Sequence, residues 1–286
     1  MQVRAGAKVN LCLHVGAPDA RGYHPLQSLV AFADMGDDLR LTSGTGAARL
    51  TIDGPFAQGL AADDSNLILK ALRRFEAETG VPVPVDIHLT KALPLAAGVG
   101  GGSADAGAVL RGLRALYAPD MDEATLEAIA ASTGADGVMC LWSKPAVAEG
   151  YGEKLTFVSL PSLACVLINP RVPSPTAEVY AAYDRQGRFP PFAPVFTPDM
   201  GRDPARLMTF LRAARNDLEA PAIALNPVIG EVLQSLRAQP LTQLARLSGS
   251  GATCFALCTT DEAARALAQS LAALWPQAWI RACRLG

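Results

Sequence analysis

The sequence of 286 residues predicts an α+β fold with two domains. Segments with the alternation of strands and segments with helical spacing follow one another in an irregular order, which favours α+β over a doubly wound sheet. The chain is long enough for two domains that each have a hydrophobic core. Half of the residues are hydrophobic and 18% are charged, as in globular proteins.

The first half of the chain supplies the strands and helices of one predicted domain. Residues 3–15 alternate, so that Lys8 and Asn10 share one face of a strand and lie about 7 Å apart. Further strands are predicted at 39–42, 49–52 and 85–89, and helices at 66–78, after the glycines near residue 100, and at 121–132. Gly134 is the stop signal of the last of these helices.

The second half predicts another mixed domain, and we place the boundary so that the domains span 1–155 and 156–286. A continuous apolar strand is expected at 164–168, and a loop with four prolines at 188–198. The other expected elements are helices at 176–184, 204–216, 228–239 and 261–274 and strands at 254–258 and 279–284. No internal repeat is visible.

Composition and charge exclude several classes of protein. A net charge of −2 argues against a nucleic-acid partner, which usually requires a basic face. The longest uncharged stretch has 16 residues, too few for a membrane span, and no signal pattern is present. Six cysteines without a CxxC pair indicate reduced thiols, and three scattered histidines give no zinc site. We therefore expect a cytoplasmic protein. Its partner is expected to be a small molecule, and its state a monomer or weak homodimer.

The glycine-rich segment at 91–110 is the strongest functional signal. Its glycines lack a Cβ, so successive backbone N–H groups can turn toward one anion. Ser103 and Asp105 favour the start of a helix, whose first-turn amides and dipole complete an anion site. The segment is neither a Walker loop nor GxGxxG. The alternative is a tight loop between two core elements.

Several motifs, in this order and spacing, resemble those of the GHMP kinases, which are named for galactokinase, homoserine kinase, mevalonate kinase and phosphomevalonate kinase. The resemblance covers almost the whole chain and is strongest to the branch that phosphorylates a cytidine diphosphate derivative of methylerythritol. The motifs are AKVNLCLHV (7–15), GYHPLQSL (22–29), the glycine loop, GAD (134–136), AEGYGE (148–153), NDLE (216–219) and LSGSGATCFAL (247–257).

The resemblance implies a fold, a nucleotide and a catalytic pair. The fold would be a ribosomal protein S5 domain 2-like N-terminal domain and a ferredoxin-like α/β-plait C-terminal domain around a deep cleft. ATP with Mg²⁺ would bind the glycine loop, with no metal ligand assigned, and Asp136 would be the catalytic carboxylate with Lys8 as its partner. The loop residues are Pro94, Leu95, Ala96, Ala97, Gly98, Val99, Gly100, Gly101, Gly102, Ser103 and Ala104. A second loop, Ser248, Gly249, Ser250 and Gly251, would line the far side of the cleft.

The resemblance also implies a site for the second substrate. Tyr23 and His24 stand where the branch holds the cytosine, and a base would stack between Tyr23 and Tyr180. Asn10 and Thr176 complete the substrate set, with Thr176 near the diphosphate. Two alternatives stay open: Tyr23 and His24 belong to a packed turn, or Thr176 is only a helix N-cap.

The sequence departs from the family pattern at three positions. Ala104 replaces the second serine of SSDA, the usual proline after GADV is absent because Gly137 and Val138 follow Asp136, and Gly6 replaces the proline of PAK. No charged catalytic group is lost, so we expect an active enzyme. The alternatives are another GHMP kinase of homoserine or mevalonate type, against which GYH and NDLE argue, and a non-catalytic nucleotide-binding relative, which Ala104 and Gly137 leave open.

Overall fold

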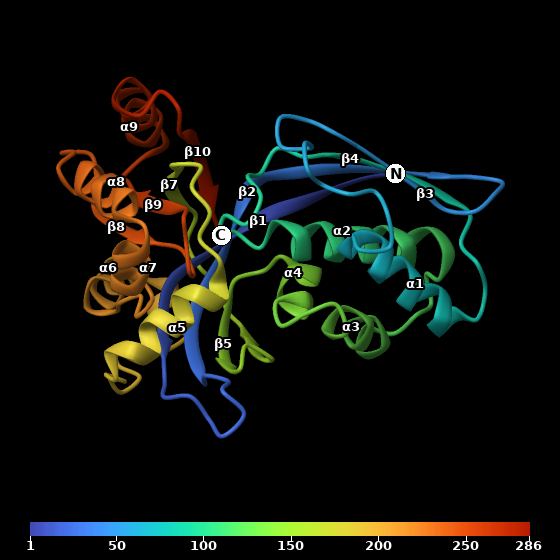
Figure 1. Ribbon diagram of the computed structural model, residues 1–286, viewed down its shortest axis with the longest axis horizontal. Coiled ribbons are helices and arrows are strands. Elements are labelled where there is room, and N and C mark those ends of the chain that lie inside the picture. The colour runs from blue at the N-terminus through green and yellow to red at the C-terminus, as the bar shows by residue number, and fades with distance from the viewer. The chain divides into compact units, whose positions relative to one another are not determined.

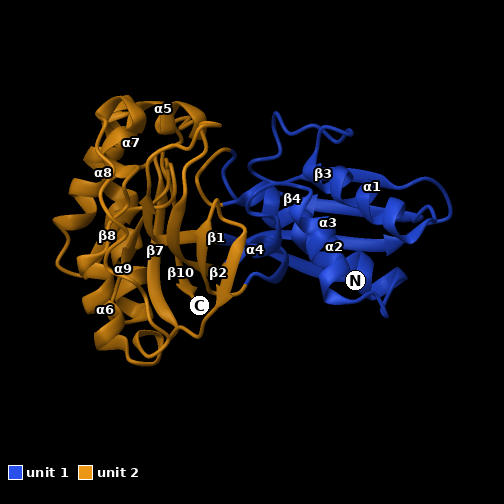
Figure 2. Cartoon of the chain, turned by 90° about the horizontal axis from the view of Figure 1, so that it is seen from below, with its two compact units in different colours: residues 1–7, 35–95, 100–143 blue, residues 8–34, 96–99, 144–286 orange.

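The computed structural model describes residues 1–286, which form two compact units (Figure 2). Unit 1 comprises residues 1–7, 35–95 and 100–143, and unit 2 comprises 8–34, 96–99 and 144–286. The units differ from the predicted division after residue 155, because the strands β1 (Gln2–Val15) and β2 (Leu26–Ser43) each contribute residues to both. Helices and strands alternate irregularly in both units, which confirms the α+β class.

Unit 1 is a sheet with helices on one side. The C-terminal part of β2 pairs antiparallel with β4 (Val85–Thr90), which pairs in parallel with β3 (Arg49–Asp53). In Figure 1 the helices lie below these strands. They are α1 (Leu67–Thr79), α2 (Gly101–Tyr117), α3 (Glu123–Ala131) and α4 (Gly137–Trp142). The buried side of this sheet and the inner face of α1 form the core, with Leu39, Leu41, Ile87, Leu89, Ile68, Leu72 and Phe75.

Local sequence explains where these helices begin. The side chain of Asn66 accepts a hydrogen bond from the amide of Ile68, and that of Asp122 accepts one from Thr125. Such side-chain caps satisfy amides that have no partner within the helix. The predicted helices at 66–78 and 121–132 are therefore confirmed, with ends shifted by one or two residues.

Unit 2 contains an antiparallel sheet with helices beside it. β7 (Leu163–Asn169) lies between β10 (Trp279–Leu285) and β9 (Cys254–Leu257), and β9 also pairs with β8 (Leu244–Leu247). The N-terminal part of β2 pairs antiparallel with β5 (Ala146–Gly150), and β5 also pairs antiparallel with β6 (Lys154–Phe157). The helices, which gather on one side of β7 and β10 in Figure 2, are α5 (Thr176–Gln186), α6 (Pro204–Ala213), α7 (Glu219–Leu225), α8 (Pro227–Arg237) and α9 (Asp261–Leu274), with a short 3₁₀ helix at Met200–Arg202.

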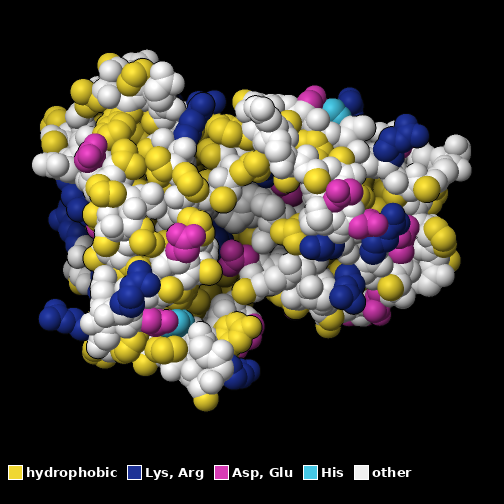
Figure 3. Space-filling model, viewed as in Figure 1, with side chains coloured by type: hydrophobic (Ala, Val, Ile, Leu, Met, Phe, Trp, Pro, Cys, Tyr) yellow, Lys and Arg dark blue, Asp and Glu magenta, His cyan; other side chains and the backbone are white.

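The structure can also be compared with the predictions drawn from composition and charge. All six cysteines are buried free thiols, as expected. None of the helices is long and apolar enough to cross a membrane. On the face shown in Figure 3, the basic side chains of unit 1 are interspersed with acidic ones.

Candidate active site

The glycine segment leads directly into α2. The helix begins at Gly101, with Gly100 in the left-handed conformation at the N-cap and the amide of Ala104 bonded to the Gly100 carbonyl. The predicted helix is confirmed, and Ser103 lies in its first turn as the third helical residue, while the N-cap is Gly100. Because the first-turn amides of a helix have no partner within it, the N–H groups after Gly100 form a positively polarised end.

Residues 96–99 of this segment pack against the second glycine loop in unit 2. A Cβ on Gly98 would lie 2.6 Å from the Gly251 carbonyl oxygen and 2.7 Å from that of Ser248, and its φ is +72°. Only glycine fits this approach. The Ser248 hydroxyl donates to the Gly98 carbonyl at 3.1 Å, and the Thr253 amide donates to that of Ala97. The 248–251 loop is therefore in contact with residues 96–99, and its place on the far side of a cleft stays a prediction.

Strand β1 supports the same loops through Lys8 and Asn10. The Lys8 amide donates to the Val99 carbonyl at 2.9 Å, and the Asn10 amide donates to the Ser248 hydroxyl at 3.1 Å. The Asn10 side chain donates to the Ser28 hydroxyl, while its Oδ1 is buried without a hydrogen-bond partner. Both side chains are buried, and Asn10 Oδ1 would lie 3.2 Å from a Cβ on Gly249 of the second loop.

The NDLE motif holds the second loop in place. The Asn216 side chain donates hydrogen bonds of 2.8 Å to the carbonyls of Leu247 and Gly249. Its own Oδ1 accepts from the Leu218 amide. Asn216 therefore acts on the shape of the 248–251 loop rather than as a direct ligand.

Asp136 occupies the N-cap position of α4, a helix that the sequence did not predict. Its side chain makes no capping hydrogen bond, so the carboxylate is not engaged with the amides of its own helix. A Cβ on the next residue, Gly137, would overlap the Ala130 carbonyl oxygen of α3. Gly137 therefore belongs to a tight α3–α4 junction that fixes the backbone of Asp136.

A buried ionic cluster lies beneath the start of α2 in unit 1. Lys91 Nζ is 2.6 Å from both Asp37 Oδ2 and Asp105 Oδ2, and all three side chains are almost fully buried. Asp37 Oδ1 accepts from the amides of Ala92 and Leu93. Burial and the Asp37 carboxylate raise the pKa of Asp105 to about 8, although Lys91 acts to lower it. The pKa of Lys91 is raised because its two carboxylate partners outweigh its burial.

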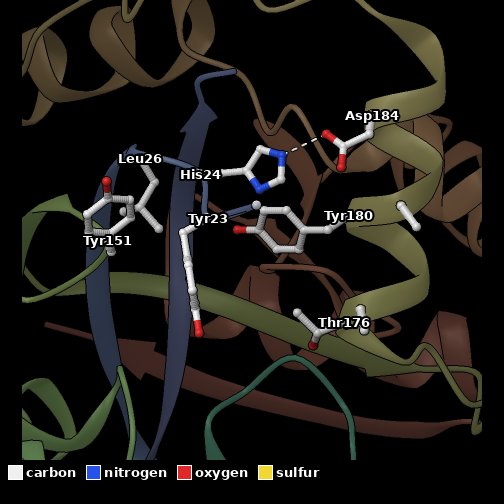
Figure 4. A pocket seen from close by; sticks show the side chains of 10 residues that line it. Tyr23, His24, Leu26, Tyr151, Thr176, Tyr180 and Asp184 are labelled. Atoms are coloured by element: carbon white, nitrogen blue, oxygen red, sulfur yellow. Dashed lines mark hydrogen bonds and ion pairs between the residues drawn. The ribbon is translucent and has the colours of Figure 1, made fainter. Parts of the chain in front are cut away.

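A pocket of about 590 Å³ in unit 2 contains most of the predicted substrate residues. In Figure 4, Tyr23 stands between Tyr151 and Tyr180, with His24 and Thr176 on the side of Tyr180. Tyr23 is 62% exposed, which excludes a fully packed turn for this ring. The pocket is lined by Gly22, Tyr23, His24, Leu26, Tyr151, Thr176, Ala177, Tyr180, Ala181 and Asp184.

His24 and Thr176 have defined partners in this pocket. His24 Nε2 lies 2.7 Å from Asp184 Oδ1, and its ring centroid lies 4.9 Å from that of Tyr180. The Thr176 hydroxyl is 2.9 Å from that of Ser250, which joins the pocket to the second glycine loop. Thr176 is the first residue of α5 and Pro175 is its N-cap, so the N-cap alternative for Thr176 is wrong.

Sequence reasoning missed Asp184 and Tyr151. Asp184 could have been found, because Thr176, Tyr180 and Asp184 are spaced by four residues and so share one face of a helix. Tyr151 lies in the turn between β5 and β6, and its place in the AEGYGE motif was the signal that could have found it. Of the predicted residues, the structure brings together Tyr23, His24, Thr176 and Tyr180 at the pocket, and Asn10, 96–99 and 248–251 at the loops, while Lys8 belongs to unit 2 and Asp136 to unit 1.

Comparison with known proteins identifies the family. Residues 66–144 match the GHMP kinases N terminal domain, and residues 201–277 match the GHMP kinases C terminal domain. The chain is 49% identical to a 4-diphosphocytidyl-2-C-methyl-D-erythritol kinase of Caulobacter sp. (strain K31), over 99% of this chain and 97% of the relative. It is 45% identical to the kinase of the same name from Rhodopseudomonas palustris, over 97% and 95%.

Solved structures agree with this assignment. The crystal structure of a 4-(cytidine 5'-diphospho)-2C-methyl-D-erythritol kinase matches with a TM-score of 0.82 and 36% identity, over 100% of this chain and 99% of that one. The crystal structure of L. major mevalonate kinase matches with a TM-score of 0.72 at 16% identity, over 100% and 95%, which shows a shared fold alone. The chain therefore belongs to the GHMP kinases and, within them, to the 4-diphosphocytidyl-2-C-methyl-D-erythritol kinases.

Proposed function

We propose that this chain transfers the γ-phosphoryl group of ATP to the 2-hydroxyl of 4-diphosphocytidyl-2-C-methyl-D-erythritol, releasing ADP. The observation that carries the proposal is the pocket in unit 2, where two tyrosines and a histidine converge at the positions that the family motifs predict. An aromatic pocket with a few polar groups suits a nucleobase, which stacks by its faces and hydrogen-bonds by its edge. Membership of the family supplies the reaction type.

Asp136 is the proposed general base and Lys8 its electrostatic partner. A carboxylate can accept the proton of the substrate hydroxyl as the phosphoryl group arrives. A nearby ammonium keeps such a carboxylate ionised and stabilises charge on the migrating group. Most of the rate enhancement would come from positioning and electrostatics, as in other phosphoryl transfers. The tight α3–α4 junction, which fixes the backbone of Asp136, favours this role.

The ATP phosphates are assigned to the 94–104 segment. Its left-handed glycines at 98 and 100 present main-chain amides, and α2 adds the positive end of its dipole. Ala104 is fully buried, so its methyl group belongs to the core of unit 1. The absence of a serine hydroxyl at this position therefore removes no exposed ligand group. The burial of Ala104 therefore argues against the alternative of a non-catalytic nucleotide-binding relative.

Mg²⁺ is proposed to enter with the nucleotide. The chain offers no cluster of three or more His, Cys, Asp or Glu side chains for a metal ion. This fits Mg²⁺, which keeps several waters and is bound through phosphates with one or two carboxylates or hydroxyls. When bound, Mg²⁺ neutralises charge on the phosphate oxygens.

The second substrate is assigned to the pocket. Its cytosine would stack between Tyr23 and Tyr180, and the edge of the base would meet His24, whose ring is oriented by Asp184. Thr176 and Asn10 would lie along the diphosphate and the polyol. Asn10 Oδ1 is suited to a hydroxyl donor because it is buried and unpartnered.

Three further assignments follow from the family. We propose that 1–155 and 156–286 are its two domains, since the matched segments 66–144 and 201–277 fall on either side of that boundary. Six buried free thiols favour the cytoplasm. A monomer or weak homodimer that binds neither nucleic acid nor membrane remains our expectation.

A panel of alcohols tests the proposed function. ADP release would be measured with 4-diphosphocytidyl-2-C-methyl-D-erythritol, homoserine and mevalonate at equal concentration. We expect the cytidine compound to be preferred by at least about 10³-fold in kcat/KM, because a pocket built for a base leaves polar groups unpaired without one. Preference for homoserine or mevalonate would replace the proposal, and ATP binding without turnover on any of them would favour the non-catalytic alternative.

A further inference from the structure

The exposed ring of Tyr23 is supported from the side away from Tyr180. Tyr151 lies on that side in Figure 4, with its ring centroid 6.2 Å from that of Tyr23 and the two planes at 74°. The guanidinium of Arg21 lies 5.5 Å from the Tyr23 centroid and 5.2 Å from the Tyr151 centroid. One cation therefore contacts both rings.

Asp19 joins these residues through both of its carboxylate oxygens. Oδ1 accepts from the amides of Arg21, at 2.8 Å, and Tyr23, at 3.0 Å. Oδ2 accepts from Arg21 Nε at 3.0 Å, from Arg21 Nη2 at 2.9 Å and from the Tyr151 hydroxyl at 2.9 Å. Five hydrogen bonds thus converge on one side chain in the loop that carries Tyr23.

Asp19 and Arg21 each stabilise the charged form of the other. Partial desolvation of Asp19 acts to raise its pKa, but the hydrogen bonds from Tyr23, Arg21 and Tyr151 outweigh it and hold the pKa well below its usual range. The pKa of Arg21 is raised by Asp19 and, next, by Tyr151. The carboxylate of Asp19 and the guanidinium of Arg21 therefore both stay charged at neutral pH.

We propose that Asp19, Arg21 and Tyr151 are positioning residues that hold the Tyr23 ring for stacking and leave only its Tyr180-facing side open to the base. The proposal rests on the proposed function of the pocket. A surface tyrosine gains rotamer freedom when nothing holds it, and binding must then reorder it. A cation on one face of the ring also blocks stacking there and attracts the ring electrostatically.

The test compares Arg21→Ala and Tyr151→Phe with wild type by steady-state kinetics. Tyr151→Phe retains the ring but removes the hydroxyl that donates to Asp19. We expect each variant to raise KM for the cytidine substrate about three- to tenfold, from the usual worth of one hydrogen bond or one cation–π contact. Values of kcat and KM for ATP should stay within about twofold, since neither residue contacts the reacting groups. Arg21→Lys, which restores the cation, should recover part of the loss.

A matched control and a double-mutant cycle separate positioning from general damage. Tyr117→Phe removes a hydroxyl that donates to the Pro84 carbonyl at 2.8 Å, in unit 1, and should leave both KM values unchanged. In a Tyr23→Ala background, Tyr151→Phe should have no further effect, because it acts through Tyr23.

Two failures are distinguishable. If Tyr23→Ala raises KM for the cytidine substrate but Arg21→Ala and Tyr151→Phe do not, or if their effects persist without Tyr23, the positioning role is overturned while the pocket assignment stands. If Tyr23→Ala itself leaves that KM unchanged, or wild type does not phosphorylate the cytidine compound, the proposed function fails first.

Discussion

At the scale of single residues, Asp136 illustrates how a common residue type acquires a particular setting. Aspartate at a helix N-cap usually accepts hydrogen bonds from the first amides of that helix. Asp122 does so at the start of α3, whereas Asp136 does not at the start of α4. The two residues therefore form a natural pair for comparison.

Replacing Asp136 by Asn should reduce kcat by about 10²- to 10⁴-fold, the usual worth of a general base. The ATP dissociation constant should change by less than about twofold, because the phosphates are assigned to the glycine segment. Single-turnover kinetics and nucleotide titration measure the two quantities. Asp122→Asn is the control and should keep kcat, since asparagine caps helices as well as aspartate. Near-normal turnover of Asp136→Asn would remove this carboxylate from the mechanism.

The buried Lys91 cluster makes a prediction about pH. One ammonium faces two carboxyl groups, and Asp37 also accepts two backbone amides, while Asp105 Oδ1 has no partner. Burial raises the pKa of Asp105 to about 8, so its neutral form is favoured in the fold. Because this pKa exceeds the unfolded value of about 4, the stabilisation is complete below pH 4 and is lost as pH rises to 8.

Asparagine in place of Asp105 mimics the protonated form at every pH. The free energy of unfolding of wild type relative to Asp105→Asn should fall between pH 4 and 8, by at most about 1.4 kcal/mol per pH unit. Urea unfolding at several pH values measures this difference. A constant difference across that range would show that Asp105 is ionised in the fold.

At the scale of elements, prediction succeeded where one face of an element is exposed. The helices α1, α5 and α9 could be predicted because each has an apolar face and an opposite polar face, which gives its sequence a helical period. The first half of β2 was missed because Leu26–Ala33 is buried on both faces and so lacks alternation. The short elements α4, α7, β5, β6 and β8 were missed because four to seven residues carry too little periodicity.

The packing of the two glycine loops predicts the effect of a single methyl group. Alanine at position 98 would place its Cβ 2.6 Å from the Gly251 carbonyl oxygen and would force a positive φ. We expect a loss of about 1–3 kcal/mol in stability and a rise of at least about tenfold in KM for ATP, because the loop amides would be displaced. Thermal unfolding and kinetics measure these. Gly46→Ala is the control, since nothing lies within 4 Å of a Cβ there. An unchanged KM for ATP in Gly98→Ala would show that this loop takes no part in nucleotide binding.

At the scale of the whole molecule, the order of the motifs along the chain indicates the family, and the irregular succession of strands and helices indicates the α+β class. Composition and periodicity alone would not identify the family, because Asp136 and Tyr23 have ordinary surroundings in the sequence. The support of Tyr23 could not be predicted, since the hydrogen bond from Tyr151 to Asp19 spans 132 positions of the chain. Contacts of that kind form only when the strands β2 and β5 pair.

The bounds of the compact units were equally hidden from the sequence. The compact units are not continuous segments of the sequence, because β1 and β2 contribute residues to both. Long strands of this kind look uniform in sequence. The division of the chain into two units therefore follows from the pairing of its strands rather than from local composition.

The central claim is that the phosphoryl group of ATP reaches the 2-hydroxyl of the methylerythritol moiety. Phosphorus and carbon NMR of the products from purified protein, ATP and the cytidine substrate tests it most directly. The account predicts one new phosphomonoester, coupled to carbon 2, in amounts equal to ADP. ADP without that phosphomonoester, or a phosphoryl group on another hydroxyl, would contradict it.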